Sequence, residues 1–441
     1  MRRLIFVALG WCLLAPTLSA ADPLRDAVTA DYGYLSVLYQ HLHRNPELSF
    51  QEQESAKRMA AELGGLGFDV TTGVGGHGVV AVMKNGDGPT VLIRTDMDAL
   101  PVAEQTGLPY ASTATANEQT GREVQVMHAC GHDIHMTVWT GTARRLAALK
   151  DTWSGTLVMI GQPAEERGAG ARAMIEDGLF TRFPRPDVNL ALHVSSGLEA
   201  GRLGLAEGFA MANVDSVDIT VFGVGGHGAY PHMTKDPIVL AAHIVTALQT
   251  LVSREVSPLD PAVVTVGSIN GGEKHNIISD RVDMQLTVRS YKDEVRETLL
   301  SGIARIAKSE AAAFGFPEDK MPVIKVRDEY TPAAYNTPAM ARQLTTAWKK
   351  RFGDDRVVKL DPVMGGEDFG RYGREEPRIP STMFMLGAVD PAKVAAAKEA
   401  GEKLPSLHSS KFAPLPKPTI ITGVEAMTTA ALDVFRALPG G

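Results

Sequence analysis

The sequence predicts an α/β protein with a mostly parallel sheet and helices on both faces, interrupted by a smaller inserted α+β domain. Short apolar runs at residues 90–95, 156–161 and 188–192 alternate with helical patterns, which is typical of buried parallel strands. From about residue 213 the strand patterns instead alternate polar and apolar residues, as half-exposed strands do. The chain has 441 residues, more than a single core usually supports, so two domains are expected.

In the first half of the chain, each predicted strand is followed by side chains that can bind metal or move protons. These are Asp96 and Asp98 after residues 90–95, Glu165 and Glu166 after residues 156–161, and His193 after residues 188–192. A helix is predicted at residues 137–150, between the first two strands. Because open α/β sheets bind ligands at the carboxyl ends of their strands, we expect these side chains to meet at one site.

The strand and helix patterns in the middle of the chain predict an inserted domain at residues 213–317. Its strands are expected at residues 215–222, 262–269 and 281–290, and its helices at 237–254 and 292–314. Such units form a sheet with one open face. Residues 22–212 and 318–441 then make the larger domain, with a buried strand at 382–386, a surface helix at 391–403 capped by Asp390, and a closing helix at 423–438.

The first 21 residues are typical of a cleavable secretory signal. Arg2 and Arg3 supply the positive start, residues 4–14 are the apolar segment, and residues 19–21 are small enough for cleavage before Asp22. The apolar segment is too short to span a membrane, and no later stretch is expected to do so. We therefore predict a periplasmic or secreted protein.

The charge balance is acidic. The chain has 44 Lys and Arg against 51 Asp and Glu, a net charge of −7, which becomes −9 when Arg2 and Arg3 leave with the signal. This balance argues against nucleic acid or an anionic membrane as a partner.

One cysteine remains after removal of the signal, which contains Cys12. Cys130 lies in the sequence MHACGHDIH, two residues from both His128 and His132. A free exposed thiol is a liability in an oxidising compartment, whereas a thiolate can be committed to a metal ion. An inert buried cysteine is the alternative, but the density of histidines around Cys130 favours a metal site.

The pair Glu165-Glu166 can offer one carboxylate to a metal ion and keep the other free. A free carboxylate beside a metal-held water is what general-base hydrolysis needs. Taken alone, this pair would indicate a solvated surface, His193 would indicate a structural histidine, and His408 would indicate nothing. Thiolate, imidazole and carboxylate together suit zinc, with Mn, Co or Ni as alternatives.

Six segments of the chain occur together in a specific order. They are RTDMDALP at residues 94–101, HACGHD at 128–133, PAEE at 163–166, GGH at 225–227, GGEDF at 365–369, and His408. With these segments the chain resembles the hippurate hydrolase and indole-acetyl-amino-acid hydrolase branch of the aminoacylase/carboxypeptidase metallohydrolases. The resemblance covers nearly the whole chain after the signal.

The resemblance implies a site for two divalent metal ions (Zn, Mn, Co or Ni) in each subunit. Cys130 would bridge the ions, with His132 and His193 completing the shell of one ion and Glu166 and His408 that of the other. Glu165 would be the general base that takes a proton from the water and delivers it to the leaving amine. Asp98 would orient a ligand from behind, His135 is expected in a similar place, and the role of Asp96 stays open.

The resemblance also assigns a role to the inserted domain, which would form a homodimer and act as a lid. His227 would reach across the dimer and donate a hydrogen bond to the developing oxyanion. Asn276 and Arg289 would bind the carboxylate of the substrate, since a guanidinium has donors that match it. An ordinary surface ion pair is the alternative for Arg289.

The expected activity is cleavage of N-acyl or N-aroyl amino acids (hippurate-like, indole-acetyl-like or N-acetyl) to a carboxylic acid and a free amino acid. The first alternative is a metallo-carboxypeptidase or dipeptidase, in which Glu367 or Asp368 would bind a free α-amino group. The second is a binding protein that kept the fold without the chemistry, and the intact ligand set counts against it.

Overall fold

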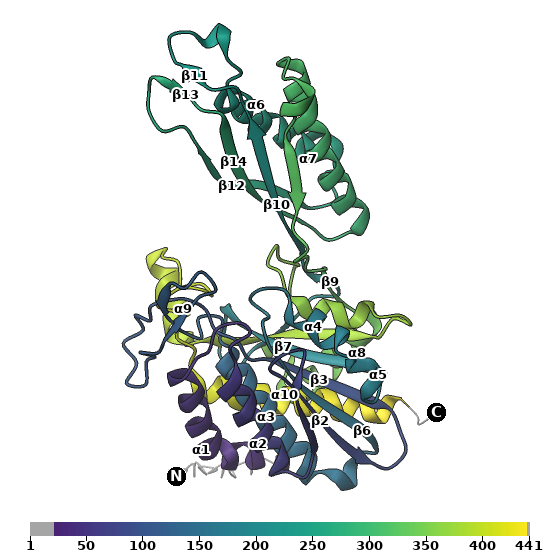
Figure 1. Ribbon diagram of the computed structural model, residues 1–441. Coiled ribbons are helices and arrows are strands. Elements are labelled where there is room, and N and C mark those ends of the chain that lie inside the picture. Colours follow the sequence, from purple (N-terminus) through teal and green to yellow (C-terminus); the bar gives the residue numbers. More distant parts are fainter. Residues whose placement is uncertain (1–21, 439–441) are drawn as a thin grey trace, which may run out of the picture.

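The structure, a computed structural model, describes residues 22–438, and the chain forms two domains (Figure 1). The predicted signal, with Cys12, lies outside the described residues. The α/β prediction is confirmed: the larger domain is built on an eight-stranded sheet of order β1-β2-β6-β3-β7-β18-β8-β17. In that order the strands are Asp69–Val74, Gly78–Asn85, Gly155–Gln162, Thr90–Asp96, Val188–Glu199, Ser381–Val389, Leu203–Leu205 and Val357–Lys359.

The centre of this sheet is parallel and buried. β3 pairs in parallel with β6 and β7, and β7 pairs in parallel with β18, whereas β1 and β2 pair antiparallel at one edge. The central strands are buried over most of their length because helices cover both of their faces. One face packs against α1 (Pro23–Arg44), α2 (Gln53–Gly64), α3 (His132–Ala148), α8 (Pro338–Phe352) and α10 (Pro416–Ala437). The other packs against α4 (Gly170–Glu176), α5 (Leu179–Arg182) and the 3₁₀ segment η6 (Asp368–Arg374).

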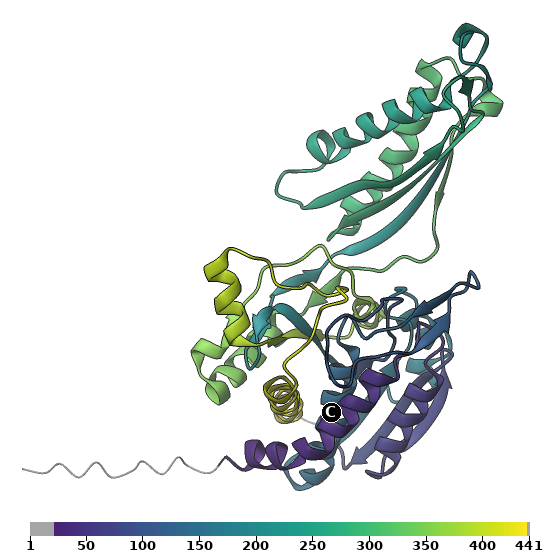
Figure 2. The ribbon, with the colours of Figure 1, turned by 90° about the vertical axis from the view of Figure 1, so that its left-hand side faces the viewer.

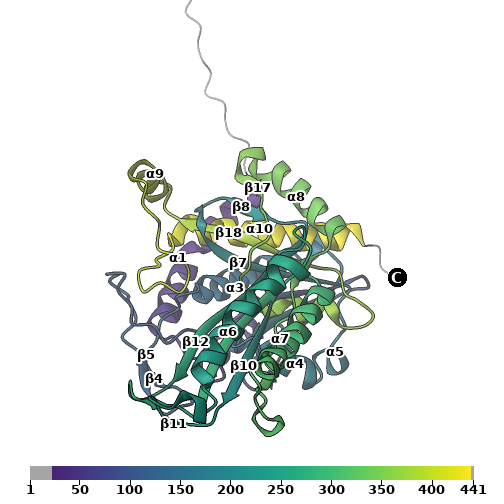
Figure 3. The ribbon, with the colours of Figure 1, turned by 90° about the horizontal axis from the view of Figure 1, so that it is seen from above.

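The smaller domain has a four-stranded antiparallel sheet of order β12-β14-β10-β15. These strands are Ala262–Gly271, Arg281–Ser290, Asn213–Phe222 and Val323–Val326. Helices α6 (Pro237–Thr250) and α7 (Asp293–Ala313) cover one face of the sheet (Figure 2) and lie nearest the viewer when the molecule is seen from above (Figure 3). Side chains of β10 are alternately buried and half-buried, as the alternating pattern predicts.

Short elements complete the structure. They are β4 (Thr115–Asn117), β5 (Glu123–Gln125), β9 (Gly208–Met211), β11 (Gly226–His227), β13 (Ile277–Ile278), β16 (Ala334–Asn336) and α9 (Pro391–Ala400). The Asp390 side chain caps α9 by accepting a hydrogen bond from the Ala392 N–H at 2.9 Å, as predicted. This helix ends at Ala400, where Gly401 takes a left-handed conformation.

Two strands connect the domains, one leading out and one leading back. β9 and β16 pair antiparallel, and beyond them Val214 bridges Thr331. The chain therefore leaves the larger domain and re-enters it at neighbouring points.

Several element bounds differ from the predictions, and for β15 and β7 the reason is long-range strand pairing. β15 extends the four-stranded sheet beyond residue 317, since it pairs with β10. β7 runs past His193 to Glu199, where β18 still pairs with it. α3 begins at His132 rather than residue 137, and α6 continues as a π-helical turn over Leu251–Glu255.

One segment after the predicted signal meets the length and composition of a membrane-spanning helix, although no such segment was expected. Pro237–Glu255 has 19 residues and a mean hydropathy of 1.3, enough on those grounds alone for a membrane-spanning helix. In the structure its inner face packs on the smaller domain's sheet through Leu240, Ile244 and Leu248. Only 33% of its most apolar window is buried, and a single helix of this kind is weak evidence for a membrane span.

Candidate active site

The predicted metal ligands and the predicted base meet at the carboxyl edge of the central strands. They line a cavity of about 770 Å³ to which both domains contribute, the smaller one through Val214, Ser216 and Arg289. Its wall includes most of the expected metal ligands and the expected base, namely Cys130, Glu165, Glu166, His193 and His408. His132 is fully buried behind them.

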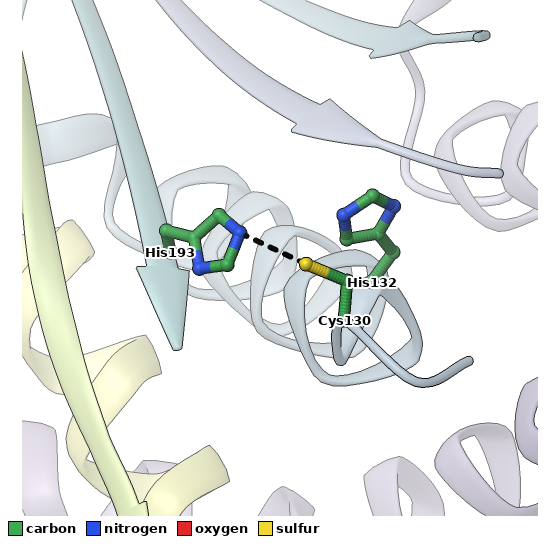
Figure 4. Close-up of side chains that lie close together, drawn as sticks. All are labelled: Cys130, His132 and His193. Atoms are coloured by element: carbon green, nitrogen blue, oxygen red, sulfur yellow. Dashed lines mark hydrogen bonds between the residues drawn. The ribbon is translucent and has the colours of Figure 1, made fainter. Parts of the chain in front are cut away.

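Cys130 is the centre of the cluster. Its Sγ atom lies 3.4 Å from His193 Nε2 (Figure 4) and 3.3 Å from His408 Nε2. Two groups of potential ligands share this thiol: Cys130 with His132 and His193, and Cys130 with Glu166 and His408. Ligand atoms around a tetrahedral zinc ion lie about 3.5 Å apart, given its bond lengths. The spacing therefore fits two ions that share the sulfur.

Gly131 makes this arrangement possible. It has a left-handed φ of 83°, and a Cβ atom there would lie 2.6 Å from Val194 Cγ2. The turn ends at the first residue of α3, so the side chains on either side of Gly131 both reach the site.

Outer hydrogen bonds orient the imidazoles. Nδ1 of His132 lies 2.8 Å from the Asp98 carbonyl oxygen, and Nδ1 of His193 lies 2.7 Å from the Val194 carbonyl oxygen. A proton on Nδ1 that is donated to a carbonyl leaves Nε2 free to bind metal. Among the described residues, His132 Nε2 and Glu166 Oε1 are buried without a hydrogen-bond partner, and they lie 3.9 Å apart. A cation between them would satisfy both atoms.

The electrostatics also favour cations. Burial, together with nearby carboxylates such as Glu367, raises the pKa of Glu165 well above its usual value. Burial raises the pKa of Glu166 to about 7, and burial with Glu166 nearby raises the pKa of the Cys130 thiol. Divalent ions would reverse these shifts by stabilising the anionic forms. The donor set thus fits a pair of such ions.

Asp98 supports the site in two ways. Its carbonyl oxygen accepts from His132, as described above, while its carboxylate accepts the N–H groups of Glu165 and Glu166 at 3.1 and 3.0 Å. Ser49 Oγ donates to the same carboxylate at 2.6 Å. The aspartate therefore holds both a ligand and the turn that carries the glutamate pair.

A buried network around Arg94 was not predicted from the sequence. The Arg94 guanidinium lies 2.7 Å from Asp96 Oδ2 and 2.8 Å from Glu367 Oε1, and it also contacts Asp368 and Gln162. Asp96 in turn holds His135, whose Nδ1 lies 2.7 Å from its carboxylate. An arginine inside an apolar strand was the one sequence signal for this network.

His135 lies behind the ligands, as expected. Its Nε2 accepts the Val194 N–H at 2.9 Å, and the Val194 carbonyl oxygen orients His193. Burial lowers the pKa of His135 to about 3, so the ring stays neutral. Both ring nitrogens are used, which leaves none for a metal ion.

Two predicted residues do not reach this cavity within the chain. His227 in β11 and Asn276 beside β13 are exposed at the end of the smaller domain that is remote from the larger one (Figure 1). The Gly228 N–H donates to the Asn276 carbonyl oxygen at 2.8 Å, which ties their two segments together.

Arg289, in contrast, lines the cavity. Its Nη1 donates to the Met364 carbonyl oxygen at 2.8 Å, and it forms no ion pair with an acidic side chain among the described residues. Burial lowers the pKa of this guanidinium, since no anion offsets the loss of water. The alternative of a surface ion pair is therefore excluded within the described part of the chain.

A buried ion-pair network behind α3 predicts a pH-dependent stability. His43 lies between Asp133 and Glu104, at 2.6 and 3.1 Å. Burial opposes its charge, but these two hydrogen bonds outweigh burial and raise the His43 pKa to about 9. Protonated His43 therefore stabilises the fold fully below its unfolded-state pKa of about 6.5, and this contribution is lost as the pH rises towards 9.

We expect the free energy of unfolding to fall between pH 6.5 and 9 in the wild type, and to fall less in His43→Gln. Denaturant titrations at matched metal content would measure both slopes. Equal slopes for the two proteins would show that His43 does not carry the charge.

Comparisons with known proteins agree with this geometry. The family model described as peptidase family M20/M25/M40 matches residues 92–408. A putative amidohydrolase YhaA of Bacillus subtilis is 35% identical over 404 residues, which cover 90% of this chain and 93% of that protein. Thermostable carboxypeptidase 2 of Saccharolobus solfataricus is 34% identical over 395 residues (89% and 93%). A hippurate hydrolase of Campylobacter jejuni is 37% identical over 343 residues (77% and 85%).

A solved structure extends the similarity to three dimensions. It is the Bacillus subtilis YXEP protein, described as a dinuclear metal binding peptidase from the M20 family. It superposes with a TM-score of 0.74 at 28% identity, over 93% of this chain and 99% of that one. Both domains of the chain are thus shared with a protein that binds two metal ions.

Proposed function

The chain belongs to the peptidase family M20/M25/M40 and is a metal-dependent amidohydrolase or peptidase, and from this premise we propose that its substrates are N-acyl or N-aroyl amino acids. It would cleave them to a carboxylic acid and a free amino acid. Hippurate-like, indole-acetyl-like and N-acetyl substrates all contain an amide bond next to a free carboxylate.

The observation that carries this proposal is the unpaired guanidinium of Arg289 in the cavity that holds the ligand cluster. A half-buried cation without an anion favours a ligand that brings one. The carboxylate of an amino acid product is such an anion, and it would place the neighbouring amide bond towards Cys130 and Glu165.

In this proposal, Cys130 would be a ligand common to two divalent ions, with His132 and His193 helping to hold one and Glu166 and His408 helping to hold the other. When bound, the ions lower the pKa of a water molecule and polarise the amide carbonyl. Glu165 would accept the proton of the attacking water and return it to the leaving nitrogen. Asp98 keeps His132 and the Glu165-Glu166 turn in place while this happens.

Peptides are the alternative substrates, since a relative is named a carboxypeptidase. A dipeptidase would need an acidic group for the free α-amino group of its substrate. Glu367 and Asp368 were the candidates, but both contact the buried Arg94 guanidinium, at 2.8 and 3.3 Å. Their engagement with Arg94 favours substrates whose amino group is acylated.

The test of this function is hydrolysis of benzoyl-glycine, N-acetyl amino acids and a glycyl dipeptide by the purified protein. The protein would be chelated and then given Zn, Mn, Co or Ni singly. Acyl amino acids cleaved faster than the dipeptide, with activity lost on chelation and restored by an ion, would support the proposal. Faster dipeptide cleavage would favour the peptidase, and ligand binding without turnover under any metal would favour a binding protein.

Replacing Arg289 by alanine should raise KM for benzoyl-glycine by about 10–100-fold, because a charge-assisted hydrogen bond contributes about 1.5–3 kcal/mol. Benzoyl-glycinamide, which lacks the carboxylate, serves as the matched substrate. The wild type should prefer the acid, and the variant should lose this preference. A variant with the wild-type preference would remove Arg289 from substrate binding.

The exposed position of His227 and Asn276 supports a homodimer in which each smaller domain serves the partner's site. His227 would donate a hydrogen bond to the developing oxyanion there, and Asn276 would contact the substrate carboxylate. Homodimers are also the commonest oligomers by base rate.

Mixed dimers test this arrangement. His227→Ala should lower kcat by about 100-fold or more, and Cys130→Ala should be inactive on its own. In a mixed dimer, one site would have both an intact ligand set and an intact His227. Random mixing should therefore restore about one quarter of the wild-type activity. Isolated mixed dimers without activity would exclude a contribution from the partner subunit.

We also propose that the protein is exported, on the basis of the signal pattern in residues 1–21. N-terminal sequencing of the protein from a periplasmic or secreted fraction should find Asp22 as the first residue. Retention of Met1 in a cytoplasmic fraction would exclude export.

A further inference from the structure

The turn that carries Glu165 and Glu166 is held by two buried carboxylates, of which the mechanism above uses one. The N–H groups of three consecutive residues donate to them. That of Ala164 donates to Glu52 Oε1 at 2.7 Å, and the next two donate to Asp98 at 3.1 and 3.0 Å. Glu52 comes from the loop before α2, far from this turn in the sequence.

Ala164 has a backbone conformation that needs support. Its φ is +48°, in the left-handed region that residues other than glycine rarely adopt. The residue lies between the end of β6 and the glutamate pair, so its conformation sets the direction in which the next residues leave the sheet. The hydrogen bond to Glu52 is made by the N–H group of this residue.

Outside its own loop, the Glu52 carboxylate accepts a hydrogen bond only from Ala164 among the described residues, while the backbone N–H groups of Phe50 and Glu52 also favour its charged form. Glu52 precedes the first residue of α2, a position from which an acidic side chain often caps its own helix, yet its side chain makes no such bond. The carboxylate of Glu47 takes that role by accepting the N–H groups of Glu54 and Ser55, at 3.1 and 2.7 Å.

Glu52 is also costly to bury. It is 0% exposed, and its Oε2 atom has no hydrogen-bond partner among the described residues. Burying a glutamate in such surroundings lowers the stability of the fold, so a functional role for one of its contacts would account for its presence. The contact that reaches beyond its own loop is the Ala164 N–H group.

We propose that Glu52 is a positioning residue that holds Ala164 in its left-handed conformation and thereby aims Glu165 at the reacting water and Glu166 at the metal ions. This inference rests on the proposed function, because it acts through the base and ligand named there. It adds the segment between α1 and α2 to the parts of the chain that shape the site.

Glutamine is the conservative replacement for Glu52. Burial, with Asp98 nearby, raises the Glu52 pKa to about 8, so the side chain is mostly neutral at pH 7. Glu52→Gln keeps the acceptor oxygen at the same reach, Glu52→Asp draws it back by one methylene, and Glu52→Leu removes it. Glu425→Leu is the matched control, since Glu425 is a 1% exposed glutamate in α10 whose Oε1 atom has no hydrogen-bond partner among the described residues and only a 3.9 Å ion pair with Arg25.

The experiment compares kcat, KM and the visible spectrum of the cobalt-loaded protein for these variants. E52L and E52D should lower kcat by about 10–100-fold, as loss of outer support for a metal site does, with KM within about threefold. E52L should also shift the cobalt bands, because Glu166 is re-aimed. E52Q should recover most of the kcat, and E425L should match the wild type in both readouts.

A second substitution separates positioning from general destabilisation. Glycine adopts a positive φ without support, so adding Ala164→Gly to E52L should restore part of the lost kcat. If E52L does not fold, E52D with and without Ala164→Gly gives the same comparison. No recovery by glycine would overturn the proposal.

Wild-type kcat in both E52L and E52D, or an E52Q variant as impaired as E52L, would also overturn it. A different result would reject the proposed function itself: full turnover in Glu165→Ala. An inactive Glu165→Ala beside an unimpaired E52L would reject the role of Glu52 alone.

Discussion

Replacing Glu165 by alanine should lower kcat by about 10²–10⁴-fold, the range that a general acid–base contributes, while the protein keeps its metal ions. The two ligand groups that share Cys130 do not include Glu165, although its Oε2 atom lies 3.9 Å from His132 Nε2. The substitution therefore removes a proton acceptor beside the ligands. Turnover of benzoyl-glycine and metal content by elemental analysis would be measured on the same samples.

Two variants control for this loss. Glu165→Gln keeps the shape of the side chain but cannot take up a proton, so it should be about as inactive as the alanine variant. Glu425→Ala removes a buried glutamate from α10 and should leave kcat unchanged. Full turnover in Glu165→Gln would assign the proton transfer to another group.

Replacing Cys130 by alanine should remove both metal ions, because its thiol belongs to both ligand groups. The loss of metal affinity should exceed the 10–100-fold that is typical of outer partners, and activity should fall below detection. The wild-type protein loaded with cobalt should show a thiolate-to-metal absorption band in the near ultraviolet, and this band should be absent from the variant. Both measurements are meaningful only if Cys130→Ala still folds, which circular dichroism would check.

Removal of one non-shared ligand is the matched comparison. His408→Ala should weaken the binding of the ion that Glu166 helps to hold and leave the binding of the other ion unchanged. His193→Ala should weaken the binding of the ion that His132 helps to hold and leave the ion at Glu166 and His408 in place. If Cys130→Ala lost one ion and retained the other at wild-type affinity, the thiol would not be shared.

Local patterns were enough to predict the α/β fold and the place of the metal-binding cluster. Apolar runs that end in polar side chains indicate parallel strands and their ligand-binding edge. Such runs can be recognised without knowing which strands pair with each other. That edge predicts a shared place for Glu165, Glu166 and His193, and the histidines around Cys130 predict a metal site, whereas His408 joined the expected ligand set only through the resemblance. Membership in the M20/M25/M40 family and a dinuclear metal centre agree with the resemblance drawn from the same residues.

Local patterns could not predict features that depend on contacts between residues far apart in the sequence. Arg94 is satisfied by Glu367 and Asp368, more than 270 residues away, and a strand pattern cannot name those partners. The hydrogen bond between Glu52 and Ala164 spans 112 residues. The strand Val323–Val326 was missed for the same reason, since it is a strand only through its pairing with β10.

The paired connection of β9 with β16, and of Val214 with Thr331, has a consequence for how the molecule could be engineered. Because the outgoing and returning strands are neighbours, a short loop could join them and delete the smaller domain without rethreading the larger one. Such a minimal protein would keep every proposed metal ligand but lose Arg289, His227 and Asn276. Ion binding and substrate selection would then belong to separable modules, and new specificities could be grafted onto an unchanged metal centre by exchanging the insert.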